Sequence, residues 1–550
     1  MTRVSLWALL ILFALVWFVN LGSRALAEPD EGRYAEIPRE MLVSGDWITP
    51  RLNGFKYFEK PALQYWATAL GYKVFGVNEA MSRWYGTTLA FLTVPLMCWL
   101  GRRVYGEPTG VLAALLLAGS LMWAALGHVN TLDIALGFWL SLALAAFLAA
   151  QHDTPVSRRG SARGWMWLAW LAIAAATLQK GLVAIALPGA AMVAYAAIQR
   201  DARLFARLYL FDGLIIVLAI AGPWFWLVSQ RNPEFANFFF IHEHFTRFLT
   251  TVHRRDEPWW YFLPWLLLGL LPWIVPVSRG VVSAWREPTQ PNAFHSGRFL
   301  VIWPAVTVLF FSASGSKLAP YIVPMFPPLA LLAGRWLAEQ PTDRLRRDVL
   351  PVAITAAALL TGAGAWLWLA NRPQWDSYRH AAPFLLLAGG VTLMGCGLAS
   401  WRTNAQDRTG AVAVGGVAIV AFASLVAVQL LLGAFGSPGI QRSSYHYAQI
   451  IQSRSQPGDA LFFVGGYWQS LPFYLGRTGQ LAAFEGELQF GIEREPALYL
   501  PDVAAFAQAW RSSPRAVAVV NPQLFQDVQR SGIAMQILFR DEGAVIIAAP

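Results

Sequence analysis

Long apolar runs with no charged residue recur along most of the chain, from Leu6 to Leu432. A helix that crosses a bilayer needs about 20 predominantly apolar residues, so these runs predict about thirteen spanning helices. The predicted spans lie near residues 4–20, 84–100, 109–127, 132–150, 165–180, 182–199, 210–229, 259–278, 299–313, 318–338, 349–370, 383–400 and 409–432. The pattern therefore predicts an all-α polytopic membrane domain.

The pattern changes in residues 437–550, which have a mixed composition with frequent charges and turns. Strand-like apolar stretches, separated there by helical segments, lie at 460–464, 516–520 and 544–548. Such alternation is typical of a small soluble α/β domain. We therefore predict a membrane domain over residues 1–432, with a long outer loop over 21–83, and an accessory α/β domain over 437–550.

Two further apolar segments are predicted to lie in the membrane interface rather than to cross the bilayer. Residues 62–76 are short and carry Lys73, and a span there would move every later arginine cluster to the wrong side. Between residues 235 and 249, phenylalanines at near-helical spacing accompany basic residues, which predicts an amphipathic helix on the outer surface. An aromatic interface belt is the alternative for these phenylalanines.

Arginine clusters between the spans predict the orientation. If the N-terminus is cytoplasmic, the clusters that include Arg102, Arg159, Arg203 and Arg346 all fall in cytoplasmic loops, as the positive-inside rule requires. An odd number of spans then places the C-terminal domain on the outer side. Residues 25–27 resemble a signal-peptidase site, but the polar residues before them favour an uncleaved signal anchor.

Composition excludes a set of soluble domains, because 56% of the residues are hydrophobic, only 13% are charged, and the mean hydropathy is +0.44. The net charge of +10 does not point to nucleic acid. The basic residues form short clusters between apolar runs instead of a stripe along one face, which indicates membrane topology.

Ionisable side chains near a bilayer are unfavourable unless they line a cavity, and in this chain many fall on the predicted outer side. These outer polar residues include Asp30, Glu31, Arg33, Tyr34, Tyr57, Glu59, Lys60, His128, Asn130, Asp133, Lys180, His242, Arg247, Lys317 and Tyr321. Under the predicted topology they can face a single outward cavity.

Lys60 precedes Pro61, and this pair is typical of the start of a helix that can bind a phosphate. Proline starts a helix well and leaves the backbone N–H groups just beyond it without intrahelical partners. Lys60 would add a positive charge to the N-terminal end of that helix, which suits a phosphate group. An anchor lysine that touches lipid phosphates nonspecifically is an equally good reading of this pair.

Two aspartates invite different interpretations. Asp30 follows Pro29, and helix capping alone explains it. Asp133 opens an apolar span beside a connection with no basic residue, so we favour a functional role there. Together the two carboxylates can hold a cationic substrate group, orient an acceptor or take a proton.

A metal site and a nucleotide site have little support in the sequence. His242 and His244 point to different sides of a helix, and solvated interfacial histidines explain them, although one of them with Glu59 can bind a divalent ion. We find neither a Walker loop nor a dinucleotide-binding fingerprint. An enzyme of this kind needs an activated substrate carried by the membrane, such as a lipid-linked sugar phosphate.

Several segments resemble one family. They are residues 27–41 (AEPDEGRYAEIPREM), 45–47 (GDW), 58–61 (FEKP), 257–261 (EPWWY) and 316–321 (SKLAPY). They are similar to the aminoarabinose transferases of Gram-negative bacteria, which are GT-C membrane glycosyltransferases related to protein O-mannosyltransferases. That family moves 4-amino-4-deoxy-L-arabinose from undecaprenyl phosphate to lipid A phosphates at the periplasmic face of the inner membrane, which gives resistance to polymyxin.

The resemblance implies roles for the outer polar residues. The catalytic carboxylates would be Asp30 and Asp133, and Lys60 with Arg247 would clamp the carrier phosphate. The residues that would line the cavity are Arg33, Tyr34, Tyr57, Lys180, Lys317 and Tyr321. Glu59 and His242 would be a metal pair for an ion such as zinc.

The implied reaction is an inverting transfer from donor lipid to lipid A. Because a phosphate acceptor is already anionic, it needs no strong general base. A protein hydroxyl acceptor would need one, so the same carboxylates also suit a protein O-glycosyltransferase. A lipid flippase or secondary transporter is the non-enzyme alternative, but we see no clear internal repeat, and most charges gather at one face.

Overall fold

The computed structural model describes residues 3–152, 159–246, 257–288, 293–341, 343–370, 373–403, 410–437 and 442–550. The chain forms two compact units, each described by itself below. Residues 1–21 and 85–440 form the membrane unit, and residues 22–84 and 441–550 form the sheet unit. This grouping differs from the sequence-based one, which placed the outer loop 21–83 in the membrane domain.

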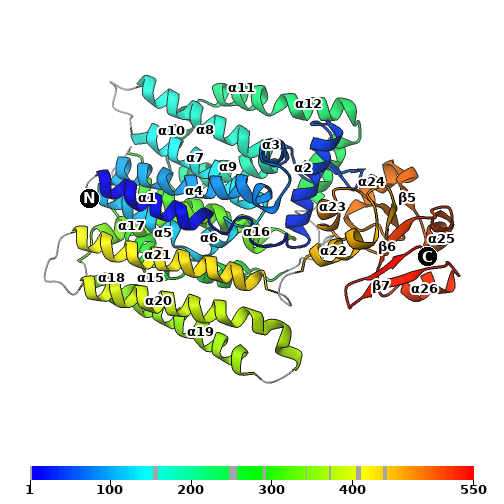
Figure 1. The fold of residues 1–550 in the computed structure, drawn as a ribbon. Coiled ribbons are helices and arrows are strands. Elements are labelled where there is room, and N and C mark those ends of the chain that lie inside the picture. The colour runs from blue at the N-terminus through cyan, green and yellow to red at the C-terminus, as the bar shows by residue number, and fades with distance from the viewer. Residues whose placement is uncertain are drawn as a thin grey trace. The chain divides into compact units, whose positions relative to one another are not determined.

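The membrane unit is a bundle of helices (Figure 1). Its N-terminal half contains α1 (Arg3–Phe18), most of α4 (Glu79–Tyr105), α5 (Glu107–Ala118), α6 (Leu121–Leu126), α7 (Leu132–His152), α8 (Arg159–Lys180), α9 (Val183–Gln199), α10 (Arg203–Ala206), α11 (Leu210–Ile220), α12 (Gly222–Arg231) and the π-helix η2 (Asn237–Thr246). Its C-terminal half contains α14 (Phe262–Gly269), α15 (Ile274–Arg286), α16 (Ser296–Ala313), the 3-10 helix η3 (Ala319–Met325), α17 (Phe326–Ala338), α18 (Asp343–Asp348), α19 (Leu350–Leu369), the 3-10 helix η4 (Pro373–Ala381), α20 (Ala382–Thr403) and α21 (Gly410–Phe435).

Helices occupy all thirteen predicted spans, which confirms the all-α membrane domain. Among the described residues, six helices are long and apolar enough to cross a bilayer. Two bent pairs, α11–α12 and α14–α15, bring this number to eight if each pair is one span. The remaining predicted spans correspond to the shorter apolar helices α1, α5 and α9 and to the long helices α4 and α8.

Small residues let the helix backbones of the membrane unit approach closely. A Cβ atom on Gly101 of α4 would lie 2.7 Å from the Cα atom of Gly110 in α5, and one on Gly334 of α17 would lie 2.7 Å from the backbone nitrogen of Ala113. Helices in membranes associate through such packing, because lipid tails are as apolar as leucine. The alanine- and glycine-rich spans therefore form a tight core around α5.

The segment around η2 differs from the amphipathic surface helix predicted for it. Phe235 and Phe239 are fully buried and stack on each other with ring centroids 5.2 Å apart. Trp224 and Phe225 of α12 pack against Phe235, at centroid distances of 5.5 and 6.3 Å. Aromatic rings bury large areas when they cluster, so Phe235 and Phe239 form an internal cluster with α12. The side chains of Phe245 and Leu249, which the same prediction included, lie outside the described residues.

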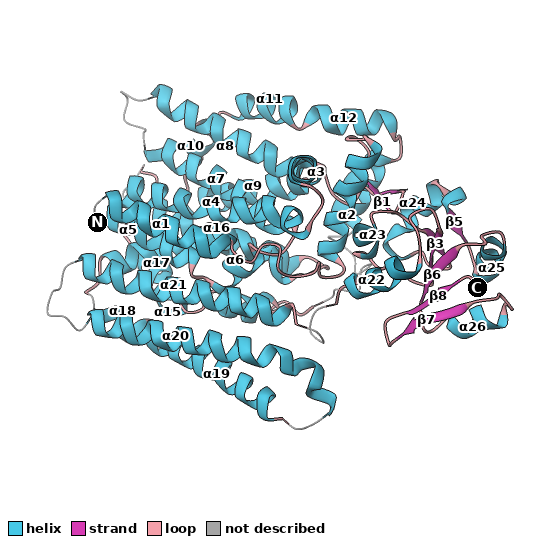
Figure 2. Ribbon diagram, viewed as in Figure 1, coloured by secondary structure: helices cyan, strands magenta, loops and turns pink. Residues whose placement is uncertain are grey.

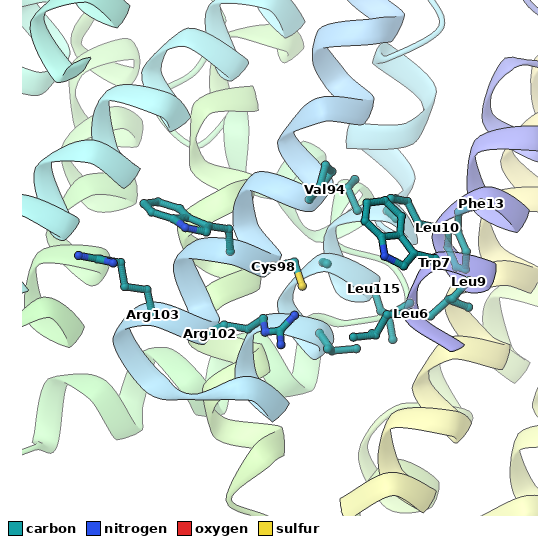
Figure 3. Close-up of a pocket in the computed structure, with 15 residues that line it drawn as sticks. Leu6, Trp7, Leu9, Leu10, Phe13, Val94, Cys98, Arg102, Arg103 and Leu115 are labelled. Carbon is teal, nitrogen blue, oxygen red and sulfur yellow. The ribbon is translucent and has the colours of Figure 1, made fainter. Parts of the chain in front are cut away.

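One cavity of the membrane unit has a volume of about 840 Å³ and lies among α1, α4 and α5. Figure 3 shows Trp7 and Phe13 of α1 on one side of it, and Arg102 and Arg103 of α4 at one end. Apart from these two arginines and the thiol of Cys98, the lining is apolar. None of the predicted site residues that the structure describes lines this cavity.

The sheet unit combines the outer loop with the C-terminal residues. The loop contributes α2 (Asp30–Ser44), β1 (Arg51–Leu52), β2 (Phe55–Lys56) and α3 (Leu63–Phe75). The C-terminal helices are α22 (Tyr445–Arg454), α23 (Leu471–Leu475), the 3-10 turn η5 (Gly486–Leu488), α24 (Gln489–Arg494), the 3-10 turn η6 (Pro496–Leu498), α25 (Val503–Arg511) and α26 (Phe525–Arg530). The predicted helix over residues 62–76 is thus confirmed, and its place in the membrane interface stays a prediction.

A six-stranded mixed sheet forms the C-terminal part (Figure 2). Its strands are β3 (Ala460–Val464), β4 (Gln480–Ala482), β5 (Tyr499–Leu500), β6 (Ala516–Val520), β7 (Gln536–Arg540) and β8 (Val545–Ala548), in the order β5-β4-β3-β6-β8-β7. The first four strands in this order pair in parallel, and β8 and β7 add antiparallel pairs. The predicted α/β domain is confirmed, and its buried strands β3, β6 and β8 are the three that the sequence predicted.

Candidate active site

The candidate cluster of the sheet unit begins at α2. Asp30 is the first residue of this helix, but no side-chain capping hydrogen bond forms there, because Pro29 occupies the N-cap position. The Asp30 carboxylate instead accepts a hydrogen bond of 3.2 Å from Arg33. The capping role predicted for Asp30 is therefore wrong, and its carboxylate faces the polar cluster described next.

Arg33 is the centre of this cluster. It is 7% exposed, forms ion pairs with Asp30 and Glu487, and lies 5.7 Å from the centre of the Tyr34 ring. Burial raises the pKa of the Glu487 carboxyl to about 7; Arg33 lowers it in part, and the nearby carboxylates of Glu59 and Asp30 raise it further. Two carboxylates thus share one buried guanidinium.

Tyr57 and Tyr65 complete the cluster. Both are buried, and burial raises the pKa of each phenol, with the charges of Arg33, Glu59 and Glu487 as common electrostatic neighbours. The Tyr34 and Tyr65 rings lie 6.4 Å apart. The predicted cavity residues Arg33, Tyr34 and Tyr57 therefore do come together, next to Glu59.

Lys60 lies in the turn before α3. Its ammonium donates a hydrogen bond of 2.7 Å to the backbone oxygen of Glu59 and is 3.9 Å from the Glu59 carboxylate. Helix α3 begins at Leu63, two residues after Pro61, as the proline predicted. The first N–H groups of a helix have no intrahelical partner, so a lysine and a helix N-terminus lie together, as a phosphate site requires.

The other acidic residues of the 27–41 segment hold this arrangement in place. Glu31 accepts hydrogen bonds from Arg83 at 2.7 and 2.9 Å, and Glu28 accepts them from Ser444 and Ser470. Glu36 and Arg39 form a buried bidentate pair at 2.6 Å. The motif thus divides into residues that build the fold and residues, Asp30, Arg33 and Tyr34, that face the cluster.

Gly32 shows why part of the motif admits no other residue. A Cβ atom there would lie 2.5 Å from the backbone nitrogen of Ser470 and 2.6 Å from the carbonyl carbon of Gln469. Only glycine lets α2 approach the C-terminal chain this closely. This contact fixes the first turn of α2, which carries Asp30 and Arg33, against the C-terminal part of the sheet unit.

Glu40 leads to a prediction about pH. Its carboxyl accepts hydrogen bonds from the backbone of Asn53 and Gly54, and burial, with the nearby charge of Glu36, raises its pKa to about 8. Between pH 4.5 and 8 the folded state then holds a proton that the unfolded chain releases, so stability falls as pH rises. We expect the melting temperature of the purified protein to drop from pH 6 to pH 8.

Glu40→Gln should flatten this dependence, because the amide does not titrate. The comparison isolates Glu40, since Glu487 contributes in the same direction in both proteins. An equal drop in melting temperature for both proteins would assign the pH dependence to other groups.

A separate polar cluster lies in the membrane unit. Asp133, at the start of α7, forms an ion pair with Lys180 at the end of α8. The Lys180 ammonium also lies 4.5 Å from the centre of the Tyr321 ring, a cation–π contact. Asp133, Lys180 and Tyr321, which the sequence placed at outer helix ends, therefore form one cluster.

The other predicted site residues of the membrane unit are Lys317, His242 and Arg247. Lys317 is buried and donates a hydrogen bond of 2.8 Å to the backbone oxygen of Ser314. His242 stacks on Phe238 at 5.1 Å and lies 3.7 Å from the Glu243 carboxylate. Arg247, the second predicted phosphate ligand, lies outside the described residues.

The metal pair is not assembled within either unit. Glu59 belongs to the sheet unit and His242 to the membrane unit. Within the described parts of the chain, no three His, Cys, Asp or Glu side chains gather where they could hold an ion. A catalytic zinc site has three protein ligands, so Glu59 and His242 alone do not define one.

Glu487 and Tyr65 are the site residues that the sequence analysis missed. Tyr65 lies in the short apolar segment 62–76, where an aromatic residue is typical of interfacial packing. Glu487 lies more than 400 residues after Arg33 in a domain with no recognisable motif. Glu485 lies two residues before it, and only the residues after it, Leu488 to Gly491, are uncharged. Nothing in this local sequence distinguishes Glu487 from a surface glutamate.

Comparisons with known proteins show the family to which the chain belongs. Residues 447–549 match the family model "Aminoarabinose transferase C-terminal domain", and residues 3–239 match "Dolichyl-phosphate-mannose-protein mannosyltransferase". The chain is 34% identical over 427 residues to the undecaprenyl phosphate-α-4-amino-4-deoxy-L-arabinose arabinosyl transferase of Erwinia tasmaniensis, covering 74% of this chain and 75% of the relative. It is 36% identical over 412 residues to that of Pseudomonas paraeruginosa, covering 73% and 72%.

Solved structures show the same relationship. The crystal structure of ArnT from Cupriavidus metallidurans bound to undecaprenyl phosphate superimposes with a TM-score of 0.91 at 34% identity, over 100% of this chain and 98% of that one. An oligosaccharyltransferase from Archaeoglobus fulgidus, at 12% identity and a TM-score of 0.52, shares the fold alone, over 94% and 69%. The chain therefore belongs to the family of undecaprenyl phosphate-aminoarabinose arabinosyl transferases, membrane glycosyltransferases of the GT-C type.

Proposed function

We propose that this protein transfers 4-amino-4-deoxy-L-arabinose from undecaprenyl phosphate to a phosphate of lipid A, at the periplasmic face of the bacterial inner membrane. The observation that carries the proposal is the agreement, over the whole chain, with a structure that binds undecaprenyl phosphate. Lys60 beside the start of α3 supports it independently, because this is the kind of site that holds a phosphate.

The proposed reaction exchanges one phosphate ester for another. An ionised oxygen of the lipid A phosphate attacks the anomeric carbon, a new carbon–oxygen bond forms, and the bond to the carrier oxygen breaks with inversion. Undecaprenyl phosphate leaves with the electron pair. Lys60 and the N-terminus of α3 stabilise the charge that develops on the leaving phosphate, and Arg247 is proposed to act with them.

In this scheme the carboxylates of Asp30 and Asp133 position the substrates and do not remove a proton from the acceptor. Asp30 is paired with Arg33, and Asp133 with Lys180. Because the attacking phosphate oxygen is already anionic, no proton has to be removed from it. The paired carboxylates are therefore suited to orient the sugar and the acceptor.

Protein glycosylation is the second candidate, because residues 3–239 match a protein mannosyltransferase model. A serine or threonine hydroxyl must lose a proton as it attacks, which calls for a carboxylate base. Both candidate carboxylates are held in ion pairs, which favours the phosphate acceptor.

The experiment that separates the two acceptors is complementation. A strain that lacks its own transferase, but still makes the lipid-linked aminopentose, should regain modified lipid A by mass spectrometry and resistance to polymyxin, because the added amine lowers the negative surface charge. An empty vector is the control. Unmodified lipid A together with newly glycosylated secreted proteins would reject the lipid A proposal in favour of protein glycosylation.

Orientation is tested by cysteine labelling after Cys98 and Cys396 are replaced by alanine. In intact cells we expect Glu257→Cys to react with an impermeant thiol reagent, and Gly164→Cys and Arg347→Cys to react only after permeabilisation, because the arginine clusters favour the cytoplasmic side. Labelling of Gly164→Cys in intact cells would overturn the proposed topology and the periplasmic placement of the site.

A further inference from the structure

Glu487 is held rigidly at the Arg33 cluster by the segment that follows it. Phe490 packs on Phe58 with ring centroids 5.8 Å apart. Gly491 fits closely against β2, since a Cβ atom there would lie 2.8 Å from the backbone oxygen of Lys56. The C-terminal part of the sheet unit thereby contributes a carboxylate to a cluster otherwise built from the outer loop.

Three polar atoms of this cluster have no hydrogen-bond partner within the described parts of the chain. They are the hydroxyls of Tyr57 and Tyr65 and the Nε atom of Arg33. Tyr57 is 2% exposed and Tyr65 is 0% exposed. Buried phenol hydroxyls in folded proteins are normally hydrogen-bonded. Two hydroxyls that lack such a partner among the described residues, near the charges of Arg33, Glu59 and Glu487, therefore indicate a polar ligand.

The charge of the cluster indicates what that ligand carries. Asp30, Glu59 and Glu487 contribute three carboxylates, against the guanidinium of Arg33 and the ammonium of Lys60. A carrier phosphate bound at Lys60 would neutralise the positive charge of the ammonium. The negative charges of the carboxylates would then outnumber the remaining positive charge of Arg33 further. A ligand with hydroxyl groups and one positive charge complements this arrangement.

We propose that Glu487, with Tyr57 and Tyr65, binds the amino sugar of the donor. The Glu487 carboxylate accepts a hydrogen bond from the sugar ammonium, and the two phenols bond to the sugar hydroxyls. This inference rests on the proposed function and deepens it, because it assigns to the C-terminal domain the recognition of an amino sugar over a neutral one. No covalent step is involved.

The test compares two donors with the full-length protein in lipid nanodiscs. One donor is undecaprenyl phosphate-linked 4-amino-4-deoxy-L-arabinose, and the other carries L-arabinose, which has a hydroxyl in place of the amine. For Glu487→Gln we expect kcat/KM to fall by about tenfold to a hundredfold for the amino donor, mainly through KM, and by less than about threefold for the neutral donor. Glu487→Asp should recover part of the loss.

Two further variants separate sugar recognition from folding. Glu495→Gln alters a neighbouring carboxylate that bonds Arg51 at 2.8 Å and the backbone nitrogen of Lys56 at 2.9 Å, so it should affect both donors equally. Tyr65→Phe removes one hydroxyl without changing charge, and it should raise KM for both donors, since both carry sugar hydroxyls.

The inference is overturned if Glu487→Gln lowers kcat/KM equally for both donors, because Glu487 would then only support Arg33. It is also overturned if KM changes for lipid A and not for the donor, or if Glu487→Gln and Tyr65→Phe both behave as the unaltered protein. Failure of the proposed function is distinguishable, because the unaltered protein would then transfer neither sugar to lipid A.

Discussion

Lys60→Ala is expected to abolish sugar transfer, with kcat at least about a hundredfold lower. Lys60 lies three residues before the start of α3, where the leaving phosphate is proposed to bind, and alanine removes the charge proposed to stabilise that phosphate. Lys60→Arg keeps a positive charge and should retain part of the activity. The measurement is single-turnover transfer to lipid A by the purified protein, followed by mass spectrometry.

Lys73→Ala is the matched control, because Lys73 lies in the last turn of the same helix α3. Its removal changes the net charge equally but leaves the N-terminal end of the helix intact, so activity should change by less than about twofold. An unchanged kcat in Lys60→Ala would contradict the catalytic role. Lys60 would then be the nonspecific membrane anchor that is the alternative interpretation of the Lys60–Pro61 pair.

The sequence predicts those elements that depend on nearby residues, and it misses those that depend on residues far apart in the chain. Spans such as α7 and α21 were predictable because a long apolar run is a local property of the sequence. Strands β3, β6 and β8 were predictable because they are buried apolar runs of four or five residues. The two- or three-residue strands β4 and β5 and the exposed β7 were not, because their place depends on a neighbouring strand.

The candidate site divides in the same way. Lys60 was found because Pro61 and the following apolar stretch are adjacent to it in the sequence. For Asp30 the local sequence predicts only a helix cap. Its partner Arg33 lies on the same helix, and only the packing of that helix shows which way both side chains face. Glu487 meets Arg33 through the tertiary fold alone. No local pattern predicts such a pair.

The ion pair of Asp133 and Lys180 leads to the second prediction of large effect. Asp133→Asn should lower kcat for transfer at least about a hundredfold, because the remaining amide cannot hold the charge pattern that orients sugar and acceptor. Lys180→Met should also lower kcat. If the two side chains act as one unit, the double variant will be little worse than either single variant, so their effects will not add.

A comparison pair in the same membrane unit shows whether this loss is specific. Asp212 of α11 and Arg163 of α8 form an ion pair at 2.7 Å, with Arg163 about half exposed. Exposed pairs contribute little to stability, so Asp212→Asn should leave transfer within about twofold and the melting temperature nearly unchanged. Wild-type kcat in a folded Asp133→Asn protein would contradict the functional role of Asp133. If Asp133→Asn lowers the melting temperature but leaves kcat normal, the ion pair would only stabilise the packing of α7 against α8. The Asp133 carboxylate would then have no role in orienting the sugar.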